Sequence, residues 1–455
     1  MDNRETFKSR IGFIMTSAGC AIGLGNVWRF PFITGKYGGA VFVLFYLVFL
    51  LILGAPIMVM ELAVGRASRK SSIRSFHVLE PQGKKWHFYG YISGAGNYLL
   101  MMFYTTVAGW MISYIFKSAR GVFTGLSADQ IDAVFTSSLA NPFEQIFFMV
   151  LVVALGFIVC AGGLKNGVEK ISTVLMTSLL LLMLILVIRS VTLKGASEGL
   201  AFYLKPDFAR MVENGIFEVI FAAMGQAFFT LSIGIGSIAI FGSYIGKEKA
   251  LTGEALNIIG LDTFVALMAG FIIFPSCFAF GVNPGAGPKL IFVTLPNIFN
   301  SMPFGRFWGT LFFIFMSFAA LTTVIAVFEN IISYAIDISG CNRQKAVFFN
   351  LILILILSLP CALGFNLLSG IQIPKIGDIQ GLEDFIVSDN LLPLGSLVYL
   401  VFCTSRYGWG YDNFIEEVNT GSGLKFPKSI RFYITWILPI VVIAIWCAGY
   451  VQKFF

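Results

Sequence analysis

Long runs of apolar residues recur along the whole chain, and they limit its fold more than any other feature. A bilayer core about 30 Å thick is crossed by roughly 20 apolar residues in a helix. A window of that length predicts eleven spans in the 455 residues. Their approximate limits are 10–36, 40–65, 87–117, 143–162, 167–191, 215–245, 256–281, 303–337, 345–366, 386–405 and 430–452. The sequence therefore predicts a multi-pass protein of the inner (plasma) membrane.

These runs predict helices rather than the strands of a membrane barrel. Barrel strands are about 9–11 residues long and alternate between apolar and polar positions, whereas these runs are longer and continuous. We therefore expect an all-α fold. Only 12% of the residues are charged, against about 25% in soluble proteins. This composition argues against a soluble enzyme, a disordered chain and a nucleic-acid-binding protein.

The net charge of +7 is explained by topology, because Lys and Arg accumulate in the cytoplasmic loops of membrane proteins. The segment between the second and third predicted spans holds the densest basic group, which is Arg66, Arg69, Lys70, Arg74, Lys84 and Lys85. We expect this segment and the N-terminus to be cytoplasmic. With eleven spans, the C-terminus then lies outside the cytoplasm.

Residues that usually carry enzymatic chemistry or bind metals are few. The seven cysteines lie mostly inside apolar runs and show no CxxC spacing, so we expect neither disulfides nor a cysteine metal site. The two histidines, His77 and His87, lie in one basic loop. That placement argues against histidine catalysis and histidine-rich metal sites. Because no nucleophile–base set stands out, we do not expect an enzyme.

Two predicted spans contain residues that weaken a helix. Residues 19–26 read GCAIGLGN and residues 230–237 read TLSIGIGS, and each interior glycine costs a helix about 1 kcal/mol. Small residues also permit close helix packing, but these interruptions occupy corresponding positions in two sets of five spans. Such pairs are typical of transporters built from inverted repeats. We predict repeats at 10–191 and 215–405, followed by an additional helix at 430–452.

An interrupted helix frees backbone groups that lipid cannot satisfy, so these groups must face a cavity or a ligand. Free carbonyls suit a hard cation such as sodium, and free N–H groups at a helix N-terminus suit a carboxylate. Polar residues inside other spans, Asp262 and the neighbours Thr322 and Thr323, are costly in a membrane and indicate function. The pattern predicts a site for a cation and an amino acid together.

Several motifs resemble the neurotransmitter:sodium symporter family. They are RIGF at 10–13, AIGLGNVWRFP at 21–31, GGA at 38–40, ELAVGR at 61–66 and GQAFFTLS at 225–232. The resemblance extends from about residue 4 to about residue 452. Eleven spans are similar to a bacterial subgroup that includes symporters of sodium with tyrosine or other hydrophobic amino acids. The resemblance implies sodium-coupled uptake of an amino acid by alternating access.

The resemblance also implies two sodium sites. The first would use the carbonyl of Ala21 and the side chains of Asn26, Thr230 and Asp262. The second would use the carbonyls of Gly19, Ile22 and Ala319 with the hydroxyls of Thr322 and Thr323. Asp262 stands where the family has asparagine, and Ala266 stands where chloride-dependent members have serine. Because the aspartate already supplies a negative charge beside the ion, we expect no chloride requirement. Whether Asp262 carries a proton on the return step stays open.

The substrate site implied by the resemblance adjoins these ions. The substrate carboxylate would meet the amides of Leu24 and Gly25 and the hydroxyl of Tyr104, and its ammonium group the carbonyls near Ala21, Phe229 and Thr230. The side-chain pocket would be lined by Ile22, Leu100, Val107, Phe229, Ser232, Ile235 and Val327. These residues carry no charge, so we expect a hydrophobic or aromatic amino acid. Among aromatic amino acids we favour tyrosine, because the hydroxyl of Ser232 or Thr323 could hydrogen-bond to its phenol group.

Two gates complete the implied machinery. Arg29 would pair with an acidic residue at the start of the tenth span, either Asp384, which we prefer, or Asp389. On the inner side, Arg4 would pair with Asp337 near Ser243 and Tyr244. The expected partners are an amino acid, sodium ions and the bilayer, and the oligomeric state stays open.

Three alternatives remain at this point: a proton-coupled amino-acid carrier of the same fold, an amino-acid sensor and a ligand-gated channel. Thr322 and Thr323 favour sodium over protons, because a proton-coupled carrier could place a cationic side chain there. A filter-like repeat would favour a channel, and an appended signalling domain would favour a sensor. Neither feature stands out in the sequence.

Overall fold

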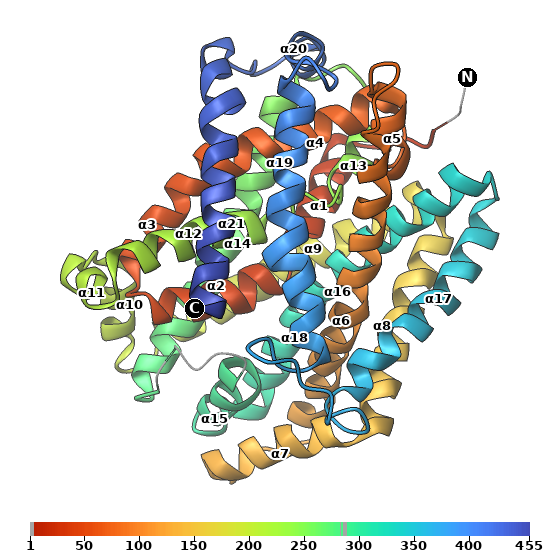
Figure 1. The fold of residues 1–455 in the computed structure, drawn as a ribbon. Coiled ribbons are helices and arrows are strands. Elements are labelled where there is room, and N and C mark those ends of the chain that lie inside the picture. The colour runs from red at the N-terminus through yellow and green to blue at the C-terminus, as the bar shows by residue number, and fades with distance from the viewer. Residues whose placement is uncertain (1–3, 283, 285–288) are drawn as a thin grey trace.

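The structure is a computed structural model that describes residues 4–282, 284 and 289–455. The described residues are mostly helical, with isolated β-bridges and no β-strand (Figure 1). The all-α prediction is confirmed. Large apolar side chains, including Phe143, Ile188, Phe348 and Trp436, are exposed on the outside, which suits contact with lipid acyl chains.

Nine continuous helices in the described part of the chain are long and apolar enough to cross a membrane. They are Ala40–Ser68 (containing α3, Ala40–Phe49, and α4, Ala55–Ser68), His87–Ala119 (α6), Pro142–Ala161 (α8), Leu164–Val191 (containing α9, Lys170–Val191), Leu251–Ala279 (α14), Gly305–Ser339 (α16), Arg343–Leu363 (α17), Ile379–Thr404 (containing α18, Ile379–Asp384, and α19, Leu392–Thr404) and Lys428–Phe454 (containing α21, Leu438–Phe454).

The two predicted spans that contain the glycine interruptions differ from the other nine. The first consists of α1, Arg10–Ala21, and a helix at Gly25–Lys36 whose second part is α2, Phe30–Lys36; the two are bent by 56°. The other consists of α12, Ile216–Thr230, and α13, Ala239–Ser243, with residues 231–238 outside any helix. The prediction at 215–245 therefore corresponds to two short helices, neither of which crosses a membrane alone, because the Gly-rich break separates them.

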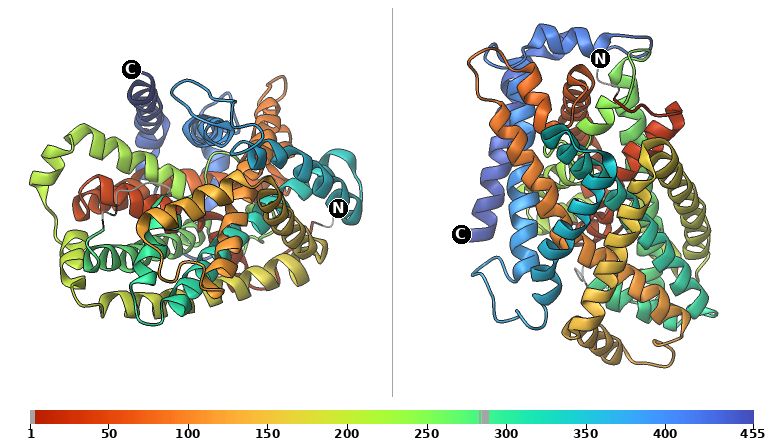
Figure 2. Two further views of the ribbon diagram at one scale, coloured as in Figure 1. Left: turned by 90° about the horizontal axis from the view of Figure 1, so that it is seen from below. Right: turned by 90° about the vertical axis from the view of Figure 1, so that its right-hand side faces the viewer.

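Shorter helices lie in the connections between the long ones. They are α5 (Ser72–Leu79), α7 (Ala128–Ala140), α10 (Ala196–Leu204), α11 (Phe208–Glu213), α15 (Leu295–Asn300) and α20 (Tyr411–Asn419). The N-terminus and α20 lie at one end, and α7 and α15 lie at the other (Figures 1 and 2). Both interrupted helices are packed inside the bundle, because α1 contacts α9, α14 and α16, while α12 contacts α3 and α13 contacts α4.

Candidate functional site

The break in the first interrupted helix is short and fully buried. Ile22, directly after α1, has extended backbone with ψ of 100°, and the helix resumes at Gly25. Glycine is required at position 23, because a Cβ there would lie 2.5 Å from the Tyr104 hydroxyl and 2.7 Å from Thr323 Oγ1. The break thus brings the α1 backbone against side chains of α6 and α16.

The second break is longer and is held by polar side chains that the sequence alone did not single out. Its backbone is left-handed at Ser232 (φ 51°), Gly234 and Gly236. Backbone carbonyls that lipid could not satisfy accept hydrogen bonds from α6 and α16 instead. The donors are Tyr89 to Gly234, Ser93 and Asn97 to Ile235 (2.6 and 2.8 Å), and Asn330 to Gly236 (3.1 Å).

Three buried polar side chains meet between the breaks, and we call them the first polar cluster. Asn26 Nδ2 donates to Thr230 Oγ1 and to Asp262 Oδ1, both at 2.9 Å. Thr230 Oγ1 in turn donates to Asp262 Oδ2 at 3.2 Å. All three residues are fully buried. The predicted side-chain ligands of the first sodium site therefore lie in contact, and Ala21, the predicted carbonyl ligand, is the last residue of α1.

The second polar cluster consists of oxygens from α1 and α16. The hydroxyl of Thr323 lies 3.3 Å from the Gly19 carbonyl, 3.2 Å from the Ile22 carbonyl and 3.5 Å from the Ala319 carbonyl. Thr322 Oγ1 donates to the same Ala319 carbonyl at 2.9 Å. One hydroxyl proton cannot satisfy three carbonyls, so the cluster has spare acceptor capacity. The five residues predicted for the second sodium site are brought together.

A central cavity of about 480 Å³ opens beside both clusters. Ten of the thirteen predicted substrate-site residues line it: Ala21, Leu24, Gly25, Leu100, Tyr104, Val107, Phe229, Ser232, Ile235 and Thr323. The Leu24 amide donates to the Tyr104 hydroxyl at 3.1 Å at its wall. Phe103 and Trp28 also line the cavity, and the sequence analysis missed them because aromatic residues are common in apolar spans.

Three predicted substrate-site residues lie in the protein interior without lining the cavity. Ile22 is fully buried, and its carbonyl faces Thr323. The hydroxyl of Thr230 is directed to Asp262. Val327 lies one helical turn beyond Thr323 on α16 and is buried.

One side of the central cavity carries charged residues. Arg29, Asp384 and Asp389 all line it, and the Arg29 guanidinium lies 4.0 Å from the centre of the Phe229 ring. Asp389 forms an ion pair with Lys453 of α21 at 2.8 Å. Arg29 has no ion pair within the described residues. Sequence reasoning missed Lys453, because nothing in the sequence places the end of α21 against the segment Phe385–Leu391 that contains Asp389.

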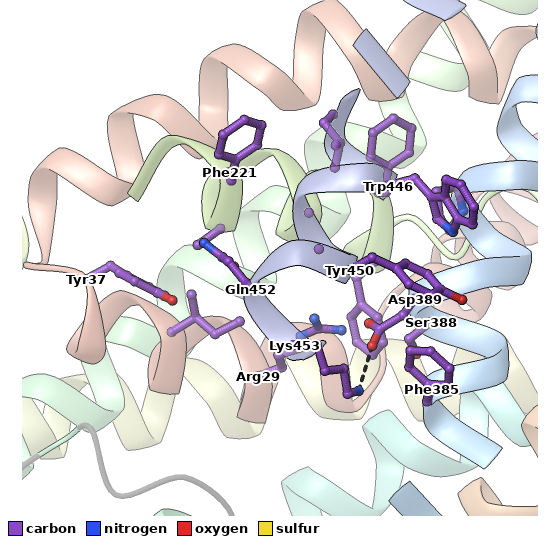
Figure 3. Close-up of a pocket in the computed structure, with 18 of the residues that line it drawn as sticks. Arg29, Tyr37, Phe221, Phe385, Ser388, Asp389, Trp446, Tyr450, Gln452 and Lys453 are labelled. Carbon is purple, nitrogen blue, oxygen red and sulfur yellow. Dashed lines mark hydrogen bonds and ion pairs between the residues drawn. The ribbon is translucent and has the colours of Figure 1, made fainter. Parts of the chain in front are cut away.

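An adjacent cavity of about 340 Å³ shares Arg29 and Phe229 with the central one. Figure 3 shows it between α2, α12 and α21, with the ion pair of Asp389 and Lys453 at its edge. Trp446 and Tyr450 of α21 point to the same side as Asp389 and donate to the Asn390 side chain at 3.2 and 2.6 Å. The two cavities share part of their lining, and the central one is lined by residues of both breaks.

At the other end of the bundle, the N-terminal segment is held against α13 and α16. Arg4 Nη1 forms an ion pair with Asp337 Oδ1 at 3.0 Å, and Arg4 Nε donates to Ser243 Oγ at 3.3 Å. The guanidinium lies 5.0 Å from the centre of the Tyr244 ring. Asp337 also accepts from the Ser71 amide at 2.7 Å. All four residues predicted for the inner gate are in contact.

Comparisons with known proteins agree with this architecture. The chain matches the model of the "Sodium:neurotransmitter symporter family" over residues 4–132 and 130–454. The uncharacterized sodium-dependent transporter YhdH of Bacillus subtilis is 35% identical, with 96% of each chain covered. A similar uncharacterized sodium-dependent transporter of Haemophilus influenzae is 33% identical, with 98% of each chain covered.

A solved structure shows the same fold. The crystal structure of MhsT in complex with L-phenylalanine has a TM-score of 0.87 to this structure and 36% sequence identity. The match covers 98% of this chain and 99% of MhsT. This chain is a membrane transporter and belongs to the sodium:neurotransmitter symporter family.

Proposed function

We propose that this transporter imports a hydrophobic or aromatic amino acid together with two sodium ions, by alternating access and without a chloride requirement. The main support is that two oxygen-rich clusters adjoin the helix breaks beside one mostly apolar cavity. The sodium-dependent relatives support the coupling ion. The repeats at 10–191 and 215–405 would move relative to one another around this site.

The first polar cluster would bind one sodium ion. Its carboxylate oxygens from Asp262 and the hydroxyl of Thr230 are hard donors that suit sodium. The Asn26 amide presents nitrogen to these residues, and a cation requires oxygen. Rotating the amide by 180° exchanges the two atoms, so we expect Asn26 to rotate when sodium binds. The Asp262 charge replaces the anion that chloride would supply.

The second polar cluster would bind the other sodium ion. Three carbonyls and two hydroxyls converge within hydrogen-bond distance, and they come from α1 and α16. An ion at this place would fix α1 against α16. Because α1 ends there and the break follows, sodium binding would favour one arrangement of the interrupted helix over another.

The substrate would lie in the central cavity. Its carboxylate would accept from the Leu24 amide in place of the Tyr104 hydroxyl and would also accept from that hydroxyl, and its side chain would contact Leu100, Val107 and Ile235. The MhsT structure contains L-phenylalanine, which supports an aromatic substrate here. Ser232 and Thr323 are among the hydroxyl-bearing residues that line the cavity, and they favour tyrosine among the aromatic amino acids.

We assign the gates from the ion pairs. Arg4 and Asp337 would close the cytoplasmic side, with the N-terminus in the cytoplasm. Asp389 is paired with Lys453, so Asp384 is the better partner for Arg29 across the opposite entrance. Because the Arg4 pair is formed and Arg29 is unpaired among the described residues, this conformation corresponds to an open or partly open outer entrance.

Binding of radiolabelled tyrosine, phenylalanine and leucine to the purified protein tests this proposal. We expect saturable binding in sodium but not in potassium, and equal binding in chloride and gluconate. Stimulation by chloride would contradict the proposed role of Asp262. Amino-acid binding that does not depend on sodium would contradict both ion sites, and it would favour a proton-coupled carrier.

A further inference from the structure

The only two histidines of the chain come together at the N-terminal end of the bundle. His77 lies in the last turn of α5, and His87 is the first residue of α6. Their rings are 5.6 Å apart between centroids and nearly perpendicular. Glu80 follows α5 directly and lies between them. The connection from α5 to α6 therefore folds back so that one carboxylate faces two imidazoles.

The distances within this group suit a small tetrahedral metal ion. Glu80 Oε1 lies 2.7 Å from His87 Nδ1 and 3.3 Å from His77 Nδ1, and one ligand atom from each residue lies within 4.8 Å of the others. Two ligands about 2.0–2.1 Å from a tetrahedral zinc ion are about 3.3 Å apart. Only small side-chain rotations would be needed to place an ion between the three residues.

The environment keeps the three donors in place and partly accessible. Glu80 Oε2 accepts from the His87 amide at 3.0 Å, which anchors the carboxylate at the start of α6. The Glu80 side chain is 8% exposed, whereas His77 is 58% exposed, so an ion can enter from solvent.

We propose that His77, Glu80 and His87 form a binding site for a divalent transition metal ion, of which zinc fits the donor set best, with water as the fourth ligand. Two imidazoles and one carboxylate are common zinc ligands. The sequence argued against a histidine-rich metal site, because it did not show that residues 77 and 87 meet around Glu80.

A metal at this site would join the end of α5 to the start of α6. The N-terminal end of α5 is already attached to the inner gate, because the Ser71 amide donates to Asp337 and Ser72 contacts Tyr334 at 2.9 Å. Zinc would therefore restrain α5 and slow opening on the Arg4 side. This effect on transport rests on the proposed function, whereas metal binding itself does not.

Metal binding is tested on the purified, chelator-treated, full-length protein. Cobalt(II) titration followed by visible absorption reports tetrahedral coordination, and zinc calorimetry gives stoichiometry and affinity. We expect one zinc per chain at micromolar concentration, and an affinity at least about tenfold weaker in H77Q, E80Q and H87Q, as removal of a ligand or its support typically causes. The matched controls are E416Q, an exposed acid of α20, and Cys447→Ser, an exposed thiol; both should bind like the parent.

Two results would overturn the site: no zinc binding at micromolar concentration, or binding that none of the three ligand substitutions weakens. A melting temperature of H77Q within about 2 °C of the parent would show that this variant folds, since the His77 side chain is 58% exposed and an exposed substitution costs little. Zinc inhibition of amino-acid uptake, lost in H77Q, tests the consequence for transport. Zinc binding without inhibition would reject the restraint on α5 and leave both the metal site and the transport function standing.

Discussion

At the residue scale, Asp262 is the one residue of the first polar cluster whose side chain can carry a charge. It is fully buried and contacts both Asn26 and Thr230. We expect Asp262→Asn to weaken sodium affinity by at least about tenfold, since a charge about 4 Å away contributes about 1–4 kcal/mol. The sodium concentration dependence of phenylalanine binding measures this affinity. Asp412→Asn, in the peripheral helix α20, is the matched control.

A second substitution tests the other cluster through the loss of one hydroxyl. Thr323→Val keeps the shape of the side chain and removes the oxygen that faces three carbonyls. We expect sodium-dependent binding to fall more than tenfold in affinity. The matched control is Thr310→Val on the same helix. The exposed Thr310 hydroxyl donates only to the backbone carbonyl of Arg306, one turn earlier. Equal effects of the two substitutions would count against a sodium site at Thr323.

Contacts between side chains of different helices could be predicted from the sequence only where motifs resembled a family. Asn26, Thr230 and Asp262 are far apart in sequence and meet as expected. Tyr89, Ser93, Asn97 and Asn330, which satisfy the second break, were missed. A polar side chain in an apolar helix has many places to find a partner, and its actual partner depends on the packing of other helices.

At the scale of elements, the helix breaks depend on close packing that glycine permits. A Cβ at Gly65 of α4 would overlap the carbonyl oxygen of Ala239 in α13. We expect Gly65→Ala to destabilise the protein by about 3 kcal/mol, the upper end for overpacking, because backbone cannot move aside easily. Thermal unfolding measures this. Gly260→Ala, with open space around it in α14, should unfold like the parent or at a slightly higher temperature.

Hydropathy alone predicted the positions of the uninterrupted helices. The spans near α6, α8, α14, α16 and α17 are continuous helices, as predicted. The span at 215–245 shows where hydropathy is insufficient. Its apolar residues continue through the break, but α12 ends at Thr230 and left-handed backbone follows at Ser232, Gly234 and Gly236. The length of such a break depends on contacts with other helices.

At the scale of the whole molecule, the proposed inner gate contains an ion pair, whereas Arg29 of the proposed outer gate has none among the described residues. The Arg4–Asp337 pair is formed and nearly buried. Removing one partner of a buried ion pair costs about 3–5 kcal/mol. We expect Asp337→Asn to increase amide hydrogen exchange in residues 4–15 and 239–244 by at least about tenfold, since about 1.4 kcal/mol is a factor of ten.

A matched control separates this effect from a general loss of charge. Asp132 forms an exposed ion pair with Lys289 at 2.9 Å, at the opposite end of the bundle. Asp132→Asn should leave exchange in residues 4–15 unchanged. If both variants accelerate exchange there equally, the Arg4–Asp337 pair does not hold the inner side closed.

Uptake into proteoliposomes under a defined ion gradient tests sodium coupling most directly. Vesicles containing the protein and a potassium buffer are diluted into sodium buffer with radiolabelled phenylalanine or tyrosine, in chloride or in gluconate. We predict accumulation above the external concentration that requires the inward sodium gradient, collapses when sodium is equal on both sides, and is the same in both anions. Accumulation driven by a proton gradient without sodium would contradict the assignment of both polar clusters as sodium sites.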